Sequence, residues 1–178
     1  MRLRTSAKVA AAAALGAVAL SAPAAARPVW QEPATGPSID RLRETLLRPG
    51  ELKGFTPLDC PTVRTDAVEQ TGFVAGLREP LAADGARGES VAAEFRTRAA
   101  ASAEAARALG AAPGATYAVA GIPGGHGYTT FAGNGYGVVF TVGQREYELH
   151  VQFAFTQSSK RAAVAAAARV VYHRALGH

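Results

Sequence analysis

The stretch GYGVVFTVGQREYELHVQFAF, residues 135–155, decides the fold. Apolar residues alternate with other residues over two runs, 136–142 and 147–155, and Gly143 to Arg145 lies between them. Successive side chains of a strand point to opposite faces, so each run predicts a strand with one apolar face. The short connection predicts an antiparallel hairpin. The intervening residues of the second run are expected to face water, and they are Glu146, Glu148, His150 and Gln152.

A lone hairpin is marginally stable in water, so the apolar face of this pair needs a cover. The residues after it can supply a helix that begins at Ser158 or Ser159 and ends at Gly177. Its apolar stripe is formed by Val164, Ala168, Val171 and Ala175. We therefore predict that this final helix packs on the apolar face of the sheet.

Upstream segments add further elements to the same sheet. A first helix is expected after Ser38 and before Pro49, and a strand pair over 72–81 and 90–96. The run 72–81 also fits a helix, with Phe73, Leu77 and Leu81 on one side, but two glycines in it favour a strand.

A second helix is predicted from Thr97, as N-cap, to Leu109, with Gly110 as its stop. Two more strands are expected at 117–122 and 127–132. Together these elements predict one α+β domain over residues 38–178. Its sheet is mostly antiparallel and its helices pack on one face, with the helix at 97–109 beside the final one.

The first 26 residues have the order of a secretory signal peptide: a positive region, an apolar run and a small-residue cleavage site. These parts are Arg2, Arg4 and Lys8, then residues 9–20, then Ala24 to Ala26. Cleavage between Ala26 and Arg27 is expected, followed by a flexible Pro-rich lead-in over 27–37. An uncleaved membrane anchor is the alternative, although the apolar run is shorter than the roughly 20 residues that span a bilayer. We predict a secreted protein on the outer side of the cell envelope, with no stable membrane anchor after cleavage.

The net charge of +5 comes largely from the signal segment. Removing its three basic residues leaves 16 basic and 14 acidic residues, a net charge of +2. No basic stripe with interleaved aromatic residues remains, so nucleic acid is not expected as a partner. Cys60 is the only cysteine and cannot form an internal disulfide.

No motif in the sequence specifies a reaction, a cofactor or a metal. The four histidines lack zinc-type spacing, and neither HExxH, CxxC nor a Gly-x-Ser-x-Gly elbow occurs. We therefore predict no catalytic residues, no metal ligands and no cofactor.

The most distinctive run for binding is IPGGHGYT, residues 122–129. Its glycines could let a ligand approach the backbone, so Gly124, Gly125, His126 and Tyr128 are the candidate binding residues. The alternative is a turn and bulge between strands, where glycine supplies a positive φ angle.

Three segments carry a resemblance to known proteins: Leu46 to Phe55, the run at Ile122, and the closing ARVVYHR helix at 168–174. Over roughly residues 40–176 the chain resembles small secreted or membrane-tethered actinobacterial proteins. These are similar in layout to envelope lipoproteins of the PsbP-like fold and to extracellular sensor domains of actinobacterial kinases. The resemblance implies an antiparallel sheet with helices on one face, outside the membrane, and no known catalysis. The chain lacks the lipobox cysteine of the tethered members, and no functional residue can be carried over.

These observations favour a secreted, non-catalytic extracellular or envelope protein that binds a ligand or a protein partner. One alternative is a secreted hydrolase whose dispersed site uses His126, Tyr128 or His150. The other is a purely structural envelope protein without a small ligand. The structural alternative predicts a sheet face filled by the protein's own side chains, without a ligand-sized cavity.

Overall fold

The predicted hairpin lies in the middle of the sheet. Strands β7 (Gly135–Val142) and β8 (Arg145–Phe153) pair antiparallel, with Val142 opposite Arg145. The turn consists of Gly143 and Gln144 alone, and Gly143 adopts a φ of 61°, which a residue with a side chain rarely adopts. Arg145 therefore belongs to the strand rather than to the turn. The computed structural model describes residues 37–58, 61–64, 70–112, 114–130, 133–154 and 160–177.

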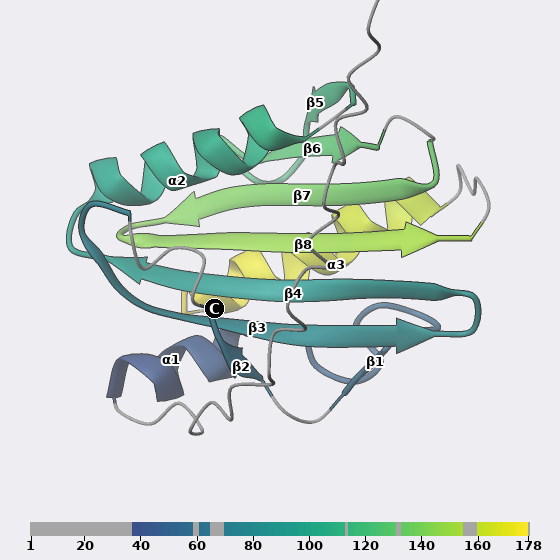
Figure 1. Cartoon of the computed structure of the whole chain (residues 1–178), viewed down its shortest axis with the longest axis horizontal. Helices are drawn as coiled ribbons and strands as arrows, with labels where there is room; N and C mark the ends of the chain where they lie inside the picture. Colours follow the sequence, from purple (N-terminus) through teal and green to yellow (C-terminus); the bar gives the residue numbers. More distant parts are fainter. Residues whose placement is uncertain are drawn as a thin grey trace, which may run out of the picture. The chain divides into compact units, whose positions relative to one another are not determined.

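All described strands form one antiparallel sheet, in the order β1-β3-β4-β8-β7-β6-β5, with β2 also paired to β3 (Figure 1). The other strands are β1 (Thr56–Pro57), β2 (Thr62–Val63), β3 (Phe73–Ala83), β4 (Ala86–Phe95), β5 (Thr116–Ala118) and β6 (His126–Thr129). The helices are α1 (Pro37–Thr45), α2 (Arg98–Ala111) and α3 (Lys160–Ala175). The predicted α+β class with an antiparallel sheet and a single domain is confirmed.

The run at 72–81 is a strand, which excludes the helical alternative. It belongs to the long hairpin of β3 and β4, whose turn is the dipeptide Asp84-Gly85. Gly85 has a φ of 64°, and Asp-Gly is a preferred sequence for two-residue hairpin turns. β3 therefore extends two residues and β4 four residues further toward the turn than the alternation alone predicted.

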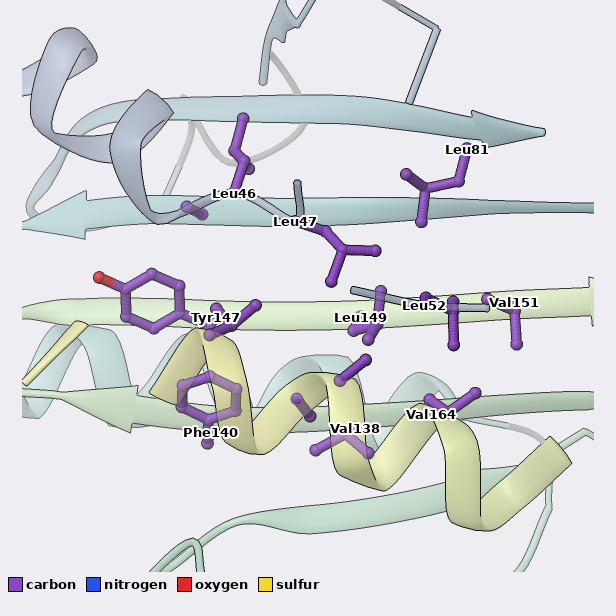
Figure 2. Close-up of a cluster of buried hydrophobic side chains, with 14 of the residues drawn as sticks. Leu46, Leu47, Leu52, Leu81, Val138, Phe140, Tyr147, Leu149, Val151 and Val164 are labelled. Atoms are coloured by element: carbon purple, nitrogen blue, oxygen red, sulfur yellow. The ribbon is translucent and has the colours of Figure 1, made fainter. Parts of the chain in front are cut away.

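The larger core lies on the sheet face that we call the α3 face, which carries Val138, Phe140, Tyr147 and Leu149. Figure 2 shows Val164 of α3 beside side chains of β7 and β8 on this face. Val164, Ala168 and Val171 are buried and Ala175 is partly buried, so the predicted stripe of the final helix is confirmed. The first helix contributes Ile39 and Leu42 to the same core.

Helix α2 lies on the opposite face, so the prediction that it packs beside the final helix is wrong. Its Ala101 packs with Ala93 and Phe95, and its Ala105 packs with Val139. Because Val138 and Val139 are neighbours in a strand, they point to opposite faces. Figure 1 accordingly shows the strands drawn over α3 but not over α2. Alanines occupy every side of α2, so its sequence contains no apolar stripe that would show which side faces the sheet.

This second surface, the α2 face, was predicted to be wet, and that prediction is also wrong where α2 covers it. Glu146 is completely buried and Glu148 is partly buried. The alternation correctly separated the two faces of β8, but it could not show that a helix covers the polar one.

The ends of several elements differ from the predictions. Helix α1 begins at Pro37, which suits the first helical position, so Ser38 lies inside the helix rather than capping it. Thr97 caps α2 as predicted, accepting a hydrogen bond from the Ala100 N–H at 3.1 Å. The helix continues through Gly110 to Ala111, so Gly110 is not its stop.

The segment from Leu46 to Phe55, which carries part of the resemblance, builds the core and ties α3 to it. Leu46, Leu47, Leu52 and Phe55 are all buried. Arg174 of α3 donates to the Leu46 carbonyl at 2.8 Å and forms an ion pair with Glu51. Glu51 also accepts from the Arg48 N–H at 2.7 Å. The segment 46–55 therefore has a structural role: it fills part of the core and fixes the end of α3.

Several predictions lie outside the described residues. They concern the signal peptide 1–26, its Ala26–Arg27 cleavage site, residues 27–36 of the lead-in, Cys60, and the caps Ser158 and Ser159. Of the helices in the described part of the chain, none has the length and apolar character needed to cross a bilayer.

Candidate functional site

The α2 face is hollow where α2 ends. A cavity of about 400 Å³ lies between the last turns of the helix and the sheet. We call it the α2 groove. It is lined by Arg64, Arg107, Ala108, Ala111, Ala112, Tyr128, Thr130, Glu148, His150 and Gln152.

Glycines in β7 make room for Thr130 and Tyr128, two residues that line this hollow. Gly135 and Gly137 alternate with the buried Tyr136 and therefore point to the α2 face. Tyr128 of β6 pairs with Gly137 and lies across it, so that a Cβ atom at position 137 would lie only 2.1 Å from the Tyr128 Cζ. A side chain at position 137 would therefore push the ring off the sheet, and this aromatic surface requires glycine there.

The ring of Tyr128 is held in place at both ends. Its hydroxyl donates to Glu148 Oε1 at 2.6 Å, and its ring stacks on that of His150 at a centroid distance of 6.0 Å and an angle of 18°. Burial, with the Glu148 carboxylate beside it, raises the pKa of Tyr128 far above its ordinary value of 10.0. The hydroxyl therefore keeps its proton and acts as a fixed hydrogen-bond donor.

A buried ionic cluster joins α2 to the sheet at the inner end of the groove. Arg64 donates to Glu146 Oε2 of β8 at 2.8 Å and to Glu104 Oε1 of α2 at 2.5 Å. Arg107 then holds Glu104 from the outer side, at 2.6 and 2.7 Å. The side chains of Arg64, Glu104 and Glu146 are each 2% exposed or less. The cluster thus pairs charges that would be costly to bury alone.

The two carboxyl groups of this cluster have opposite pKa shifts. Hydrogen bonds from Arg107, together with the charge of Arg64, hold the pKa of Glu104 below its ordinary 4.5 despite burial. Burial raises the pKa of Glu146 to about 7, with Arg64 opposing it and the charges of Glu148 and Glu104 adding to it. Glu146 Oε1 is buried and has no hydrogen-bond partner in the described part of the chain, in keeping with its raised pKa.

Two further hollows continue the groove along the sheet. One, of about 350 Å³, is lined by Arg87, Gly88, Glu89, His150 and Gln152. The other, of about 480 Å³, lies at the end of the sheet beside the β3–β4 turn and includes Arg87, Phe153 and Gln152. It is the largest of the three, but residues of the β3–β4 turn and of the strand ends form most of its lining. Gln152 lines all three hollows, and His150 also lines both the α2 groove and the hollow of about 350 Å³, so these two together form an elongated depression.

The predicted binding residues lie in different surroundings. Tyr128 lines the α2 groove. His126 is exposed on β6, two residues from Tyr128 and on the same face. Gly124 and Gly125 lie in a turn, where the Gly125 N–H donates to the Ile122 carbonyl at 2.9 Å and Gly124 has a φ of 69°. The structure therefore brings Tyr128 together with Glu148 and His150, but it does not bring the two glycines to the groove.

The sequence analysis did not identify Arg64, Arg107 or Glu148 as groove residues. The available signal was the pair Gly135 and Gly137, which alternates with large residues and marks a strand face without side chains. Helix α2 forms the other wall, and its alanine-rich sequence does not show which of its sides faces the sheet. Within the described residues, no group of three or more His, Cys, Asp or Glu could hold a metal ion.

Comparison with known proteins bears on the fold. No protein-family model and no curated protein matches the sequence. The structure is similar to the crystal structure of the extracellular domain of PknH from Mycobacterium tuberculosis, with a TM-score of 0.53 and 12% identity. The match covers 83% of this chain and 100% of that chain. The likeness to the extracellular domain of a mycobacterial kinase is thus confirmed for the fold, whereas the likeness to small envelope proteins stays a prediction.

Proposed function

We propose that this protein is a secreted, non-catalytic module that binds its ligand in the α2 groove. The observation that carries the proposal is the groove of about 400 Å³, which lies within the usual range of ligand sites, about 300–1,000 Å³. A purely structural protein was expected to fill this face with its own side chains. Here the small or medium-sized residues Ala108, Ala111, Ala112 and Thr130 leave part of the face open. The ionic cluster and Tyr128, whose hydroxyl is bonded to Glu148, keep the walls of the groove in place.

The non-catalytic part of the proposal is supported by the state of the groove's side chains. A tyrosine acts as a base or nucleophile only after it loses its proton, and the raised pKa of Tyr128 opposes this. Its hydroxyl is already committed to Glu148. The hydrolase alternative named His126, Tyr128 and His150. Of these three, His126 does not line the groove.

Binding can be tested with two variants of α2 that differ only in position. Ala111 and Ala106 are both exposed on the helix, but only Ala111 lines the groove. A111F should fill the groove, and A106F is its matched control. A thermal-shift screen of the purified protein would use cell-wall fragments, sugars, lipid vesicles, haem and divalent metals. A ligand at a hundredfold excess over Kd should stabilise the protein by about 2.7 kcal/mol, several degrees in Tm.

The expected result is at least one compound that stabilises the wild type and A106F but not A111F. If every compound of the panel leaves both proteins unchanged, or if A111F responds as the wild type does, the groove is not a ligand site. Secretion is tested separately by expressing the whole sequence in an actinobacterial host and analysing the medium. The exported chain should begin at Arg27, and retention in the membrane fraction would support the uncleaved anchor instead.

A further inference from the structure

The shape of the depression indicates an extended ligand. The α2 groove and the hollow of about 350 Å³ share both His150 and Gln152. The two hollows therefore adjoin along β8, from the last turn of α2 to Arg87 and Glu89 on β4. A compact ligand would occupy one of these hollows, whereas a short linear chain could occupy both.

The charges along this path are balanced. At one end, Arg64 and Arg107 are bonded to Glu104 and Glu146. At the other end, Glu89 pairs with Arg78 at 3.3 Å. A polyanion would meet the carboxylates of Glu148 and Glu89, and a polycation would meet the guanidinium groups of Arg87 and Arg107. Neither gains a net attraction, so the electrostatics favour an uncharged ligand.

The hydrogen-bonding groups that remain are side chains. The floor of the depression consists of strands β4, β8, β7 and β6, which are bonded to one another, so a peptide cannot join it as an added strand. Glu148 and Glu89 offer acceptors, Arg87 offers donors, and Gln152 and His150 offer both. Hydroxyl groups, which donate and accept at once, match such a mixed set. The methyl groups of Ala108, Ala111 and Ala112 form the apolar wall opposite.

We propose that the α2 groove and the adjoining hollow bind a neutral, linear oligosaccharide, with Gln152 at the centre of the site. This inference rests on the proposed ligand-binding function and names the class of ligand. Ring hydroxyls bond to the strip of Glu148, His150 and Gln152, and the apolar faces of the sugar rings lie against the alanines of α2. Tyr128 is already held by Glu148 and His150, so this part of the site is rigid before the ligand arrives. Binding therefore loses less side-chain entropy there.

Isothermal titration calorimetry and amide chemical-shift mapping would test the class of ligand. The neutral probes are chitotriose, cellotriose, maltotriose and mannotriose; the charged probes are trigalacturonate and the deacetylated chitosan trimer. We expect at least one neutral trisaccharide to bind and to shift the amides of residues 148–152. Q152A, whose side chain is exposed, should fold normally and bind about tenfold more weakly through loss of its hydrogen bonds. A111F should abolish binding, and A106F should retain it.

Several outcomes would overturn the inference. If none of the four neutral probes binds, or if one binds equally well to A111F or Q152A, the oligosaccharide is not held in this groove. If a charged trisaccharide, a lipid or a metal from the wider panel binds more tightly than the neutral probes, and A111F abolishes that binding, the ligand class is wrong but the proposed binding function stands. If nothing in either panel binds, both proposals fail.

Discussion

Gly137 and Tyr128 act as one unit on the α2 face, because the aromatic ring occupies the space that a side chain at position 137 would need. We expect G137A to destabilise the protein by about 1–3 kcal/mol, the usual cost of overpacking. The substitution should also separate the Tyr128 hydroxyl from Glu148. Urea denaturation of G137A, Y128A and the double variant would measure this coupling. Since Y128A removes the colliding ring, G137A should cost much less in that background, and equal costs would contradict the interpretation.

Glu146 should make stability depend on pH in a specific window. Its folded-state pKa of about 7 lies above its ordinary 4.5, so folding takes up a proton between these values. Its stabilising contribution is complete below pH 4.5 and is lost as the pH rises through 7. The lowered pKa of Glu104 has the opposite effect, since its contribution is lost as the pH falls below the ordinary value of 4.5.

E146Q mimics the protonated carboxyl group, so it isolates this contribution. Between pH 4.5 and 7, the free energy of unfolding of the wild type should fall relative to that of E146Q. Chemical denaturation at intervals of half a pH unit measures the difference. E44Q, at an exposed position, controls for the loss of one acidic group. Parallel curves for the wild type and E146Q would show that Glu146 ionises alike in the folded and unfolded chain.

At the scale of elements, α2 owes its stability to its cap and to the contacts of Ala101, Glu104 and Ala105 with the sheet, because its composition varies little around the helix. T97A removes the hydrogen bond to the Ala100 N–H and should lower the free energy of unfolding by about 1 kcal/mol.

G110A should stabilise the protein by about 0.5–1 kcal/mol, because a Cβ at position 110 meets nothing within 4 Å and alanine restricts the unfolded chain. Denaturant midpoints check both values, and a destabilised G110A would contradict the helical placement of Gly110.

The same helix shows where prediction from sequence ends. The hairpin of β7 and β8 could be predicted because large apolar residues recur at every second position of both strands. The existence of α2 could be predicted from Thr97, but its face could not, because alanine fits either side of a helix. Because the position of α2 could not be predicted, the groove between α2 and the sheet could not be predicted either. Without α2 on their face, Glu146 and Glu148 were predicted to face water. The pairing of Glu104 with Arg64, 40 residues away, has no signal in the local sequence.

At the scale of the whole molecule, Arg174 connects the two ends of the described chain. It joins the last turn of α3 to Leu46 and Glu51. R174M should therefore destabilise the protein by about 1.5 kcal/mol, the lower end for hydrogen bonds to charged groups because this pair is partly exposed. Hydrogen exchange should show lost protection in residues 46–55 before the strands are affected. The swapped pair E51R/R174E restores opposite charges and should recover part of the loss, and no change in residues 46–55 would contradict the connection.

Among the strands that the structure describes, the arrangement of a tyrosine lying over a glycine on the next strand occurs twice, once on each face. Tyr117 of β5 covers Gly127, and Tyr128 of β6 covers Gly137. Because each ring needs the space that its glycine leaves, replacing the glycine alone causes a collision with the ring, and replacing the tyrosine alone by a smaller residue leaves a gap above the glycine. Over evolutionary time the two members should be gained and lost together. Tyrosine and glycine spaced ten and nine residues apart, starting from positions 117 and 128, therefore give a short pattern by which distant relatives could be recognised when overall identity has decayed.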